Sequence, residues 1–136
     1  MSKIKDKIDG IHIFLEELSK IVPSEFNDYK SNNLIKAACE RYFEKIVEGV
    51  TDIAFMTIVK RKFRVPEDDI DAFRILLEGN VINEELYKKL KQAKGMRNIL
   101  AHQYGTTNHK IVFEAISEEL EKDAREFIEK VKDIQK

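Results

Sequence analysis

The stretch that decides the fold is "LIKAACERYFEKIVEGVTDIAFMTIVKRKFR", residues 34–64. Apolar side chains recur in it every three or four positions, and this spacing places them on one face of an α-helix. The residues that share this face are Leu34, Ala38, Ile46, Val50, Ile53, Thr57 and Ile58. We therefore expect one long helix over residues 33–63. Its C-terminal end carries the cationic run "KRKFR", where positive charge complements the helix dipole.

Helical spacing continues through the rest of the chain, and no segment shows the sustained alternation of a strand. We expect further helices over residues 2–21, from Pro66 to Gly79, from Asn83 to His102, and from Asn108 almost to the end. Short connections between such helices predict an all-α, up-and-down bundle of four to five helices. The length of the chain suits a single domain, residues 1–136.

The composition is that of a folded domain rather than a disordered or membrane protein, with 43% hydrophobic and 36% charged residues. No apolar run approaches the roughly 18 residues that a membrane span needs. The N-terminal "MSKIKDKIDG" lacks the apolar segment of a secretory signal. The single cysteine, Cys39, cannot form an internal disulfide and is expected in the core. We expect a cytoplasmic protein that does not contact a membrane.

The formal net charge of −1 argues against a protein that coats nucleic acid. Local basic clusters are nevertheless present: Lys88, Lys91 and Lys94 recur every third residue, and "KRKFR" follows the long helix. Ordinary surface lysines and a helix end that complements the dipole explain them most simply. Contact with an RNA backbone or a partner is the alternative, and it predicts salt-dependent binding.

Four carboxylates recur along the long helix at every fourth position, namely Glu40, Glu44, Glu48 and Asp52. A two-metal site in a helical bundle requires Glu-x-x-His pairs, and the sequence has none. A salt-bridged stripe is the favoured interpretation, and a face for a basic partner or the Lys-rich fourth helix is the alternative. The sequence also lacks a Gly-rich phosphate loop and the Cys/His spacing of a zinc site. We expect neither a metal nor a cofactor.

The segment "GMRNILAHQYG", residues 95–105, ends the fourth expected helix with four residues suited to chemistry. Asn98 and His102 are four residues apart, so the Asn98 amide can hydrogen-bond and orient the imidazole. Arg97 lies about 140° around the helix axis from His102, so both flank one broad face. Tyr104 follows the probable end of the helix, and its direction is not determined by the pattern.

These residue types suit metal-free cleavage of RNA, in which the 2′-hydroxyl attacks the adjacent phosphate. A histidine with a pKa near neutrality can remove the hydroxyl proton. An arginine provides a permanently charged fork for the phosphate, whose charge grows in the transition state. The leaving 5′-oxygen needs a second proton donor, and the segment has one histidine. A twofold homodimer with the segment at its interface would supply two histidines and two arginines.

Structural explanations compete with this hypothesis. A histidine at a helix C-terminus often interacts only with the last carbonyls, and an arginine on a helix face often pairs with an acid. His12 is expected in peripheral packing. His109 is expected in a solvated first turn, although its position after Tyr104 could bring it to the same cleft.

The segment "RNILAHQY", residues 97–104, resembles the Arg-x₄-His-x-Tyr motif of the HEPN superfamily, in the branch called HepT. The resemblance extends over almost the whole chain. "ERYFEKIVEGVTDIA" (40–54) and "VPEDDIDAFRILLEGNVINEEL" (65–86) follow the layout of that branch before the motif.

The resemblance implies one HEPN domain over residues 1–136, all-helical and homodimeric, that acts as a metal-independent ribonuclease toxin. It implies that Arg97 and His102 are the catalytic pair and that Asn98 is the supporting polar residue. It further implies that a partner nucleotidyltransferase antitoxin, MntA, modifies Tyr104 with AMP. AMP would place negative charge and bulk beside a site meant for an RNA phosphate.

Two functions remain open from the sequence. The first is an endoribonuclease toxin of a toxin–antitoxin system, neutralised by AMPylation of Tyr104. The second is a non-catalytic helical interaction module that binds the nucleotidyltransferase and uses the motif for docking or nucleotide contact. The presence of both Arg97 and His102 favours the first.

Overall fold

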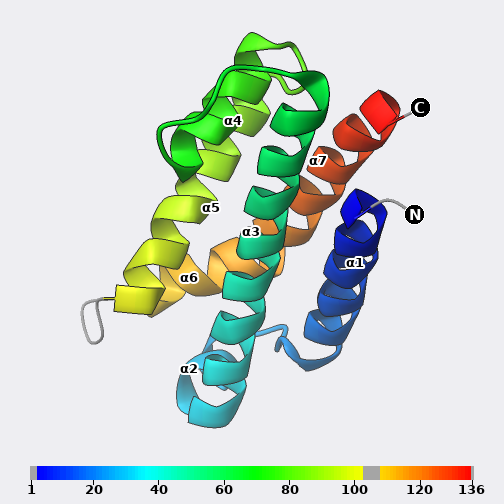
Figure 1. Ribbon diagram of the computed structural model, residues 1–136. Helices are drawn as coiled ribbons and strands as arrows, with labels where there is room; N and C mark the ends of the chain where they lie inside the picture. The colour runs from blue at the N-terminus through cyan, green and yellow to red at the C-terminus, as the bar shows by residue number, and fades with distance from the viewer. Residues whose placement is uncertain (1–2, 103–107, 136) are drawn as a thin grey trace.

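The computed structural model describes residues 3–102 and 108–135, and these residues are helical apart from short connections (Figure 1). The helices are α1 (Lys3–Ile21), α2 (Phe26–Ser31), α3 (Asn33–Arg61), α4 (Asp69–Glu78), α5 (Glu84–His102), α6 (His109–Glu114) and α7 (Leu120–Gln135), and a π-helical segment, η1 (Ala115–Glu119), joins the last two. The prediction of an all-α bundle is confirmed. No helix in the described ranges combines the length and apolarity needed to cross a membrane.

The long helix α3 forms the centre of the molecule, with α1 along one side and α5 along the other (Figure 1). It contacts α1, α2, α4, α5 and α7, so its apolar residues contribute to the core along much of its length. Cys39, Phe43 and Ile46 are buried there, as the helical spacing predicts. Leu34, predicted on the same buried face, is instead 84% exposed. It lies in the first turn of α3, which reaches the end of the bundle where the short α2 accompanies it (Figure 1).

The short helix α2 is absent from the sequence prediction. Its one buried side chain, Tyr29, packs against Phe113 of α6 with 5.1 Å between the ring centroids, and Phe26 lies 5.8 Å from the same ring. A helix of six residues cannot hold itself together in water and shows no periodicity. The aromatic contacts with α6 are what stabilise it.

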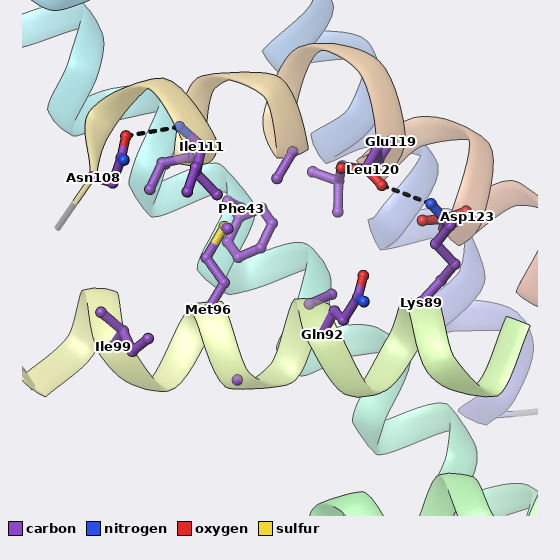
Figure 2. A pocket seen from close by; sticks show the side chains of 14 residues that line it. Phe43, Lys89, Gln92, Met96, Ile99, Asn108, Ile111, Glu119, Leu120 and Asp123 are labelled. Carbon is purple, nitrogen blue, oxygen red and sulfur yellow. Dashed lines mark hydrogen bonds and ion pairs between the residues drawn. The ribbon is translucent and has the colours of Figure 1, made fainter.

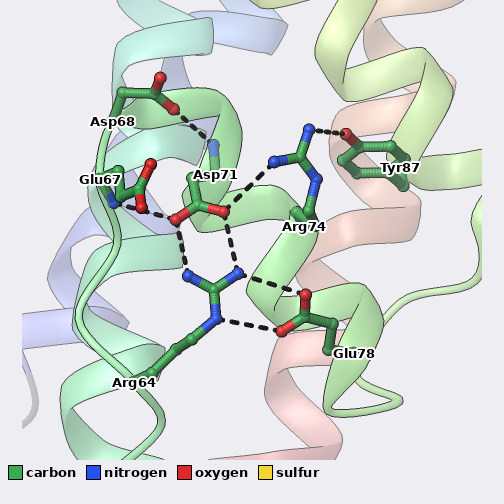
Figure 3. Close-up of polar contacts among 7 residues, drawn as sticks. All are labelled: Arg64, Glu67, Asp68, Asp71, Arg74, Glu78 and Tyr87. Carbon is green, nitrogen blue, oxygen red and sulfur yellow. Dashed lines mark hydrogen bonds and ion pairs between the residues drawn. The ribbon is translucent and has the colours of Figure 1, made fainter.

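A polar cluster fastens α4 to the segment that follows α3 (Figure 3). Arg64 donates to both carboxylate oxygens of Asp71, at 2.8 and 2.9 Å, and to Glu78 at 3.2 Å. Asp68 caps the helix by accepting a hydrogen bond from the Asp71 backbone amide at 2.7 Å. The helix begins at Asp69, so Pro66 lies before the cap and outside the first turn in which it was predicted.

Both asparagines predicted to cap helices do so. The Asn83 side chain accepts from the Leu86 amide at 2.8 Å at the start of α5. The Asn108 side chain accepts from the amides of Lys110 and Ile111, at 3.0 and 3.2 Å, at the start of α6. Ile111, although apolar, is 53% exposed. Its neighbours Val112 and Phe113 supply the buried face of α6 instead.

Candidate functional site

Arg97 lies in the last two turns of α5 and reaches across to α3. Its Nη2 donates to the carboxylate of Glu48, and its Nη1 donates to Asn98 Oδ1 at 3.4 Å. Its Nε is buried without a hydrogen-bond partner among the described residues. The side chain keeps 21% of its surface exposed. The guanidinium is therefore held in one orientation by α3 while one part of it remains open to a ligand.

Asn98 and His102 are both exposed on α5, and His102 is the last residue of that helix. The predicted hydrogen bond between them is not among the contacts of the described residues. The Asn98 amide oxygen accepts from Arg97 instead. A charged donor attracts an acceptor more strongly than a neutral imidazole does, which explains the preference. Tyr104 lies outside the described residues.

Glu48 is the site residue that sequence reasoning did not assign. It belongs to the carboxylate stripe of α3, whose members have separate structural partners: Glu48 binds Arg97, Asp52 binds Lys7 at 2.9 Å, and Glu40 accepts from a tyrosine. The preferred interpretation as a salt-bridged stripe is therefore supported for Glu48 and Asp52, whereas Glu40 has a polar partner that carries no charge. In the described ranges, no group of three or more His, Cys, Asp or Glu side chains is placed to hold a metal ion.

The lysines of α5 do not form a common surface. Lys94 is buried and pairs with Asp69 at 2.8 Å, which ties α5 to the first turn of α4. The prediction of an exposed lysine was wrong here, because Lys94 lies six residues from Lys88, about 120° around the helix axis, and faces Asp69 of α4. Lys88 is exposed and lies 4.0 Å from Glu84, and Lys91 is exposed as well.

The other two histidines occupy different surroundings. His12 Nδ1 on α1 lies 3.2 Å from the guanidinium of Arg125 on α7. Partial burial and then the charge of Arg125 lower the pKa of His12, which fits the predicted role in peripheral packing. His109 begins α6 and is half-buried, and its Nδ1 has no hydrogen-bond partner in the part of the chain that the structure describes.

A groove of about 610 Å³ runs between α5 and the α6–η1–α7 segment (Figure 2). Phe43 of α3 lies in its floor, and Met96 of α5 points into it (Figure 2). Ile99 and Ile111 line the groove near the motif and are 41% and 53% exposed. A β-carbon added to Gly95, in the middle of α5, would meet nothing within 4 Å. This face of α5 is therefore apolar and open, and Arg97 points to the other side of the helix, toward Glu48 of α3.

The opposite end of the groove is polar. Lys89 of α5 donates to Glu119 of η1 at 2.8 Å, next to Asp123 (Figure 2). Burial raises the pKa of Asp123. The groove is thus apolar near the motif and closed by an ion pair farther along α5.

The family model described as "Ribonuclease HepT-like" matches residues 11–131 of this chain. The chain is 32% identical to the mRNA nuclease HepT of Shewanella oneidensis, over 95% of this chain and 96% of that protein. It is 28% identical to the tRNA nuclease HepT of Aphanizomenon flos-aquae, over 84% of this chain and 78% of that protein.

Two solved structures share the fold. The tri-AMPylated Shewanella oneidensis HEPN toxin, in complex with its MNT antitoxin, superimposes with a TM-score of 0.89 at 25% identity, covering 98% of this chain and 99% of that one. A toxin–antitoxin structure with AMP-PNP superimposes with a TM-score of 0.88 at 25% identity, covering 96% and 97%. The fold and the sequence agree over nearly the whole length, and the resemblance seen in the motif is confirmed: this chain belongs to the family of HepT-like ribonucleases.

Proposed function

We propose that this protein is a metal-independent endoribonuclease toxin that acts in the cytoplasm as a homodimer and cleaves RNA with Arg97 and His102. The observation that carries the proposal is the orientation and partial exposure of the Arg97 side chain. Its guanidinium is oriented by Glu48 yet partly exposed, at the same helix end as the exposed His102. The names of the relatives, mRNA nuclease and tRNA nuclease, support RNA as the substrate class.

The chemistry follows from the properties of these side chains. His102 removes the proton of a 2′-hydroxyl, and the 2′-oxygen attacks the neighbouring phosphorus. The bond from phosphorus to the 5′-oxygen breaks, which leaves a 2′,3′-cyclic phosphate and a 5′-hydroxyl. Arg97 donates to the non-bridging oxygens, where charge accumulates. The His102 of a second copy protonates the departing 5′-oxygen, so the cleft contains both histidines.

The groove beside the motif supports a dimer with the motif at its interface. Ile99 and Ile111 expose apolar surface there, and such patches mark interaction sites in folded proteins. Gly95 leaves the adjoining part of α5 without a side chain, although glycine inside a helix is destabilising relative to alanine. Within the described chain, no atom lies within 4 Å of a β-carbon added at Gly95. Close approach of a second copy would explain why a destabilising glycine stands at this position.

The first experiment is cleavage of RNA by purified protein in excess EDTA, after intact mass has shown that Tyr104 carries no nucleotide. We expect 2′,3′-cyclic ends, and a loss of about 10²–10⁴-fold in rate for His102→Ala, the usual contribution of a general base or acid. His12→Ala is the matched control, because His12 packs against α7 away from the motif. Equal activity of His102→Ala and wild type would contradict the assignment. No cleavage of several RNAs by an unmodified dimer would favour the non-catalytic interaction module.

We further propose that a nucleotidyltransferase antitoxin neutralises the protein by AMPylating Tyr104. The AMPylated state of the Shewanella oneidensis toxin beside its MNT antitoxin supports this. Tyr104 belongs to the same motif as Arg97, and an added AMP would bring negative charge to a segment that we propose binds an RNA phosphate. Incubation with the antitoxin and ATP should add AMP to wild type and abolish cleavage. Tyr104→Phe should remain unmodified at that position and active, and its inactivation by the same treatment would exclude this mode of control.

A further inference from the structure

A second groove, of about 350 Å³, lies between α1 and α3. Glu48 connects the two sites, because it lines this groove and its carboxylate binds Arg97. Arg41 and Lys45 line the same groove from earlier turns of α3. They precede Glu48 by seven and three residues, so the three side chains share one helix face. A ligand that lies along this face contacts Glu48, the residue that holds the guanidinium of the motif.

Two glycines shape the groove. At Gly49 of α3, an added β-carbon would come within 2.9 Å of Ile11, so this glycine allows α1 and α3 to pack closely. At Gly10 of α1, an added β-carbon would meet nothing within 4 Å. The fold does not need a glycine at Gly10, where alanine would form a better helix. The effect of this glycine is to keep the wall of the groove free of a side chain.

The charges that remain in the groove favour an anionic ligand. Asp52 pairs with Lys7 at 2.9 Å, and Glu48 pairs with Arg97. Asp6 also lines the groove, so one further carboxylate stands against the two cations Arg41 and Lys45. No ion pair within the described ranges includes Arg41 or Lys45, although both line the groove. One helical turn, about 6 Å of rise, separates these two cations. They are placed to bind successive phosphates of one strand.

An aromatic side chain completes the groove. Phe14 of α1 is half-buried, and the Lys45 Nζ lies 5.2 Å from the centre of its ring. Tyr42 lies beside it, with 6.1 Å between ring centroids. Grooves that bind single-stranded nucleic acid combine cations that follow the backbone with aromatic rings on which bases stack.

We propose that the α1–α3 groove binds the single-stranded RNA next to the scissile bond, with Arg41 and Lys45 on phosphates and Phe14 against a base. The proposal rests on the proposed nuclease function, and it names a binding site for the substrate outside the motif. The groove increases the affinity for RNA and aligns the scissile bond with the motif, whereas Arg97 and His102 carry out the reaction.

The sharpest test fills the groove without removing any contact of the fold. Gly10→Leu places a side chain in open space and should raise the melting temperature, since leucine is a far better helix former than glycine. The same variant should weaken binding of a fluorescent, 2′-O-methylated single-stranded RNA at least tenfold by anisotropy. It should raise KM on a cleavable RNA by a similar factor and leave kcat nearly unchanged. Lys130→Ala, on the exposed face of α7, is the control and should behave as wild type.

The salt dependence of binding provides a second, independent measurement. Each phosphate contact that is lost should reduce the slope of log affinity against log salt by about 0.7 for a single strand. Arg41→Ala and Lys45→Ala should each show this reduction, and the double variant about twice as much. Because both positions are on the surface of α3, these variants should keep the wild-type melting temperature.

The outcomes separate this proposal from the nuclease function. If wild type cleaves RNA and Gly10→Leu, Arg41→Ala and Lys45→Ala all keep its KM, Kd and salt slope, the groove proposal is overturned and the nuclease stands. If Gly10→Leu instead loses binding of the nucleotidyltransferase with RNA binding intact, the groove is a protein interface and the proposal is again overturned. If wild type cleaves no RNA, the nuclease function fails first.

Discussion

At the scale of single residues, Asp71 and Glu48 show that the exposure and the binding partner of a carboxylate determine what it does in the protein. Asp71 is held by Arg64 in a cluster that fastens α4, and its side chain is 6% exposed. Glu48 is 42% exposed and holds Arg97, the arginine of the motif. Both accept hydrogen bonds from a guanidinium. The first stabilises the fold, and the second orients the arginine that we propose takes part in catalysis.

Asp71 should make the stability of the protein depend on pH. Hydrogen bonds from Arg64 and from the Glu67 backbone amide lower the pKa of Asp71 from 3.8 to about 2. A lowered pKa means that the ionised form stabilises the native state above pH 3.8, and that this contribution is lost as the pH falls to about 2. Urea unfolding should show Asp71→Asn to be less stable than wild type near neutrality, with the difference shrinking over that range. Asp9→Asn, at an exposed pair with Lys5, is the control. A difference that does not change with pH would refute the assignment.

Glu48 should affect the rate of cleavage more than the affinity for RNA. Loss of a charge-assisted hydrogen bond to Arg97 in Glu48→Ala should lower kcat by about tenfold or more. Glu48→Gln keeps an acceptor and should recover part of that loss. Asp52→Asn, one turn farther along α3 and paired with Lys7, should keep the wild-type kcat. A kcat of Glu48→Ala equal to wild type would show that Arg97 needs no orientation by α3.

At the scale of helices, the ends depend on local caps and the shortest helices depend on tertiary contacts. The caps of α5 and α6 come from asparagines beside the helices that they start. The helix α2 has no side-chain cap and is held by the packing of Tyr29 and Phe26 against Phe113. A substitution that destabilises the start of α6 should therefore destabilise α2 as well.

Asn108→Ala should reduce the free energy of unfolding by about 1 kcal/mol, the usual value of an N-cap side chain. The cap satisfies the amides of Lys110 and Ile111, which otherwise lack a partner at the helix start. Urea unfolding measures the loss, and Asn108→Ser, which restores a capping oxygen, should recover most of it. Equal stability of the alanine variant and wild type would show that the cap contributes nothing.

At the scale of the whole molecule, the two grooves lie on the two sides of α3 that face α1 and α5. The groove beside α5 is apolar near the motif and suits a second copy. The groove beside α1 is lined by cations and Phe14 and suits RNA. Arg97 lies on α5 and binds Glu48, which lines the second groove. Each groove therefore has one link to the motif, Ile99 in the first and Glu48 in the second.

Gly95→Leu should convert the proposed dimer to a monomer. The added β-carbon would meet nothing within 4 Å and the rest of the side chain enters the groove that Gly95 lines, so the monomer should stay folded. Light scattering after size exclusion should show half the wild-type mass, and cleavage should fall with it because the cleft needs both copies of His102. Lys122→Ala, at an exposed position of α7, is the control. A dimeric Gly95→Leu protein with full activity would place the interface elsewhere.

The sequence by itself determined the long helices, the asparagine caps and the motif, because these depend on residues that are close together along the chain. The apolar spacing predicted α1, α3 and α5 within about two residues at each end. The asparagine caps were readable for the same reason. The chain order also placed Arg97, Asn98 and His102 at one helix end.

Only the tertiary structure decided which helix faces are buried and which distant residues meet. Lys94 is buried because its face of α5 meets α4, and Leu34 is exposed because its turn lies at the end of the bundle. Glu48 and Arg97 are 49 residues apart, and the packing of α3 against α5 joins them. Helical periodicity gives the apolar face of each helix but not the partner of a polar side chain. That partner depends on how the helices pack against one another, and local sequence periodicity does not predict this packing.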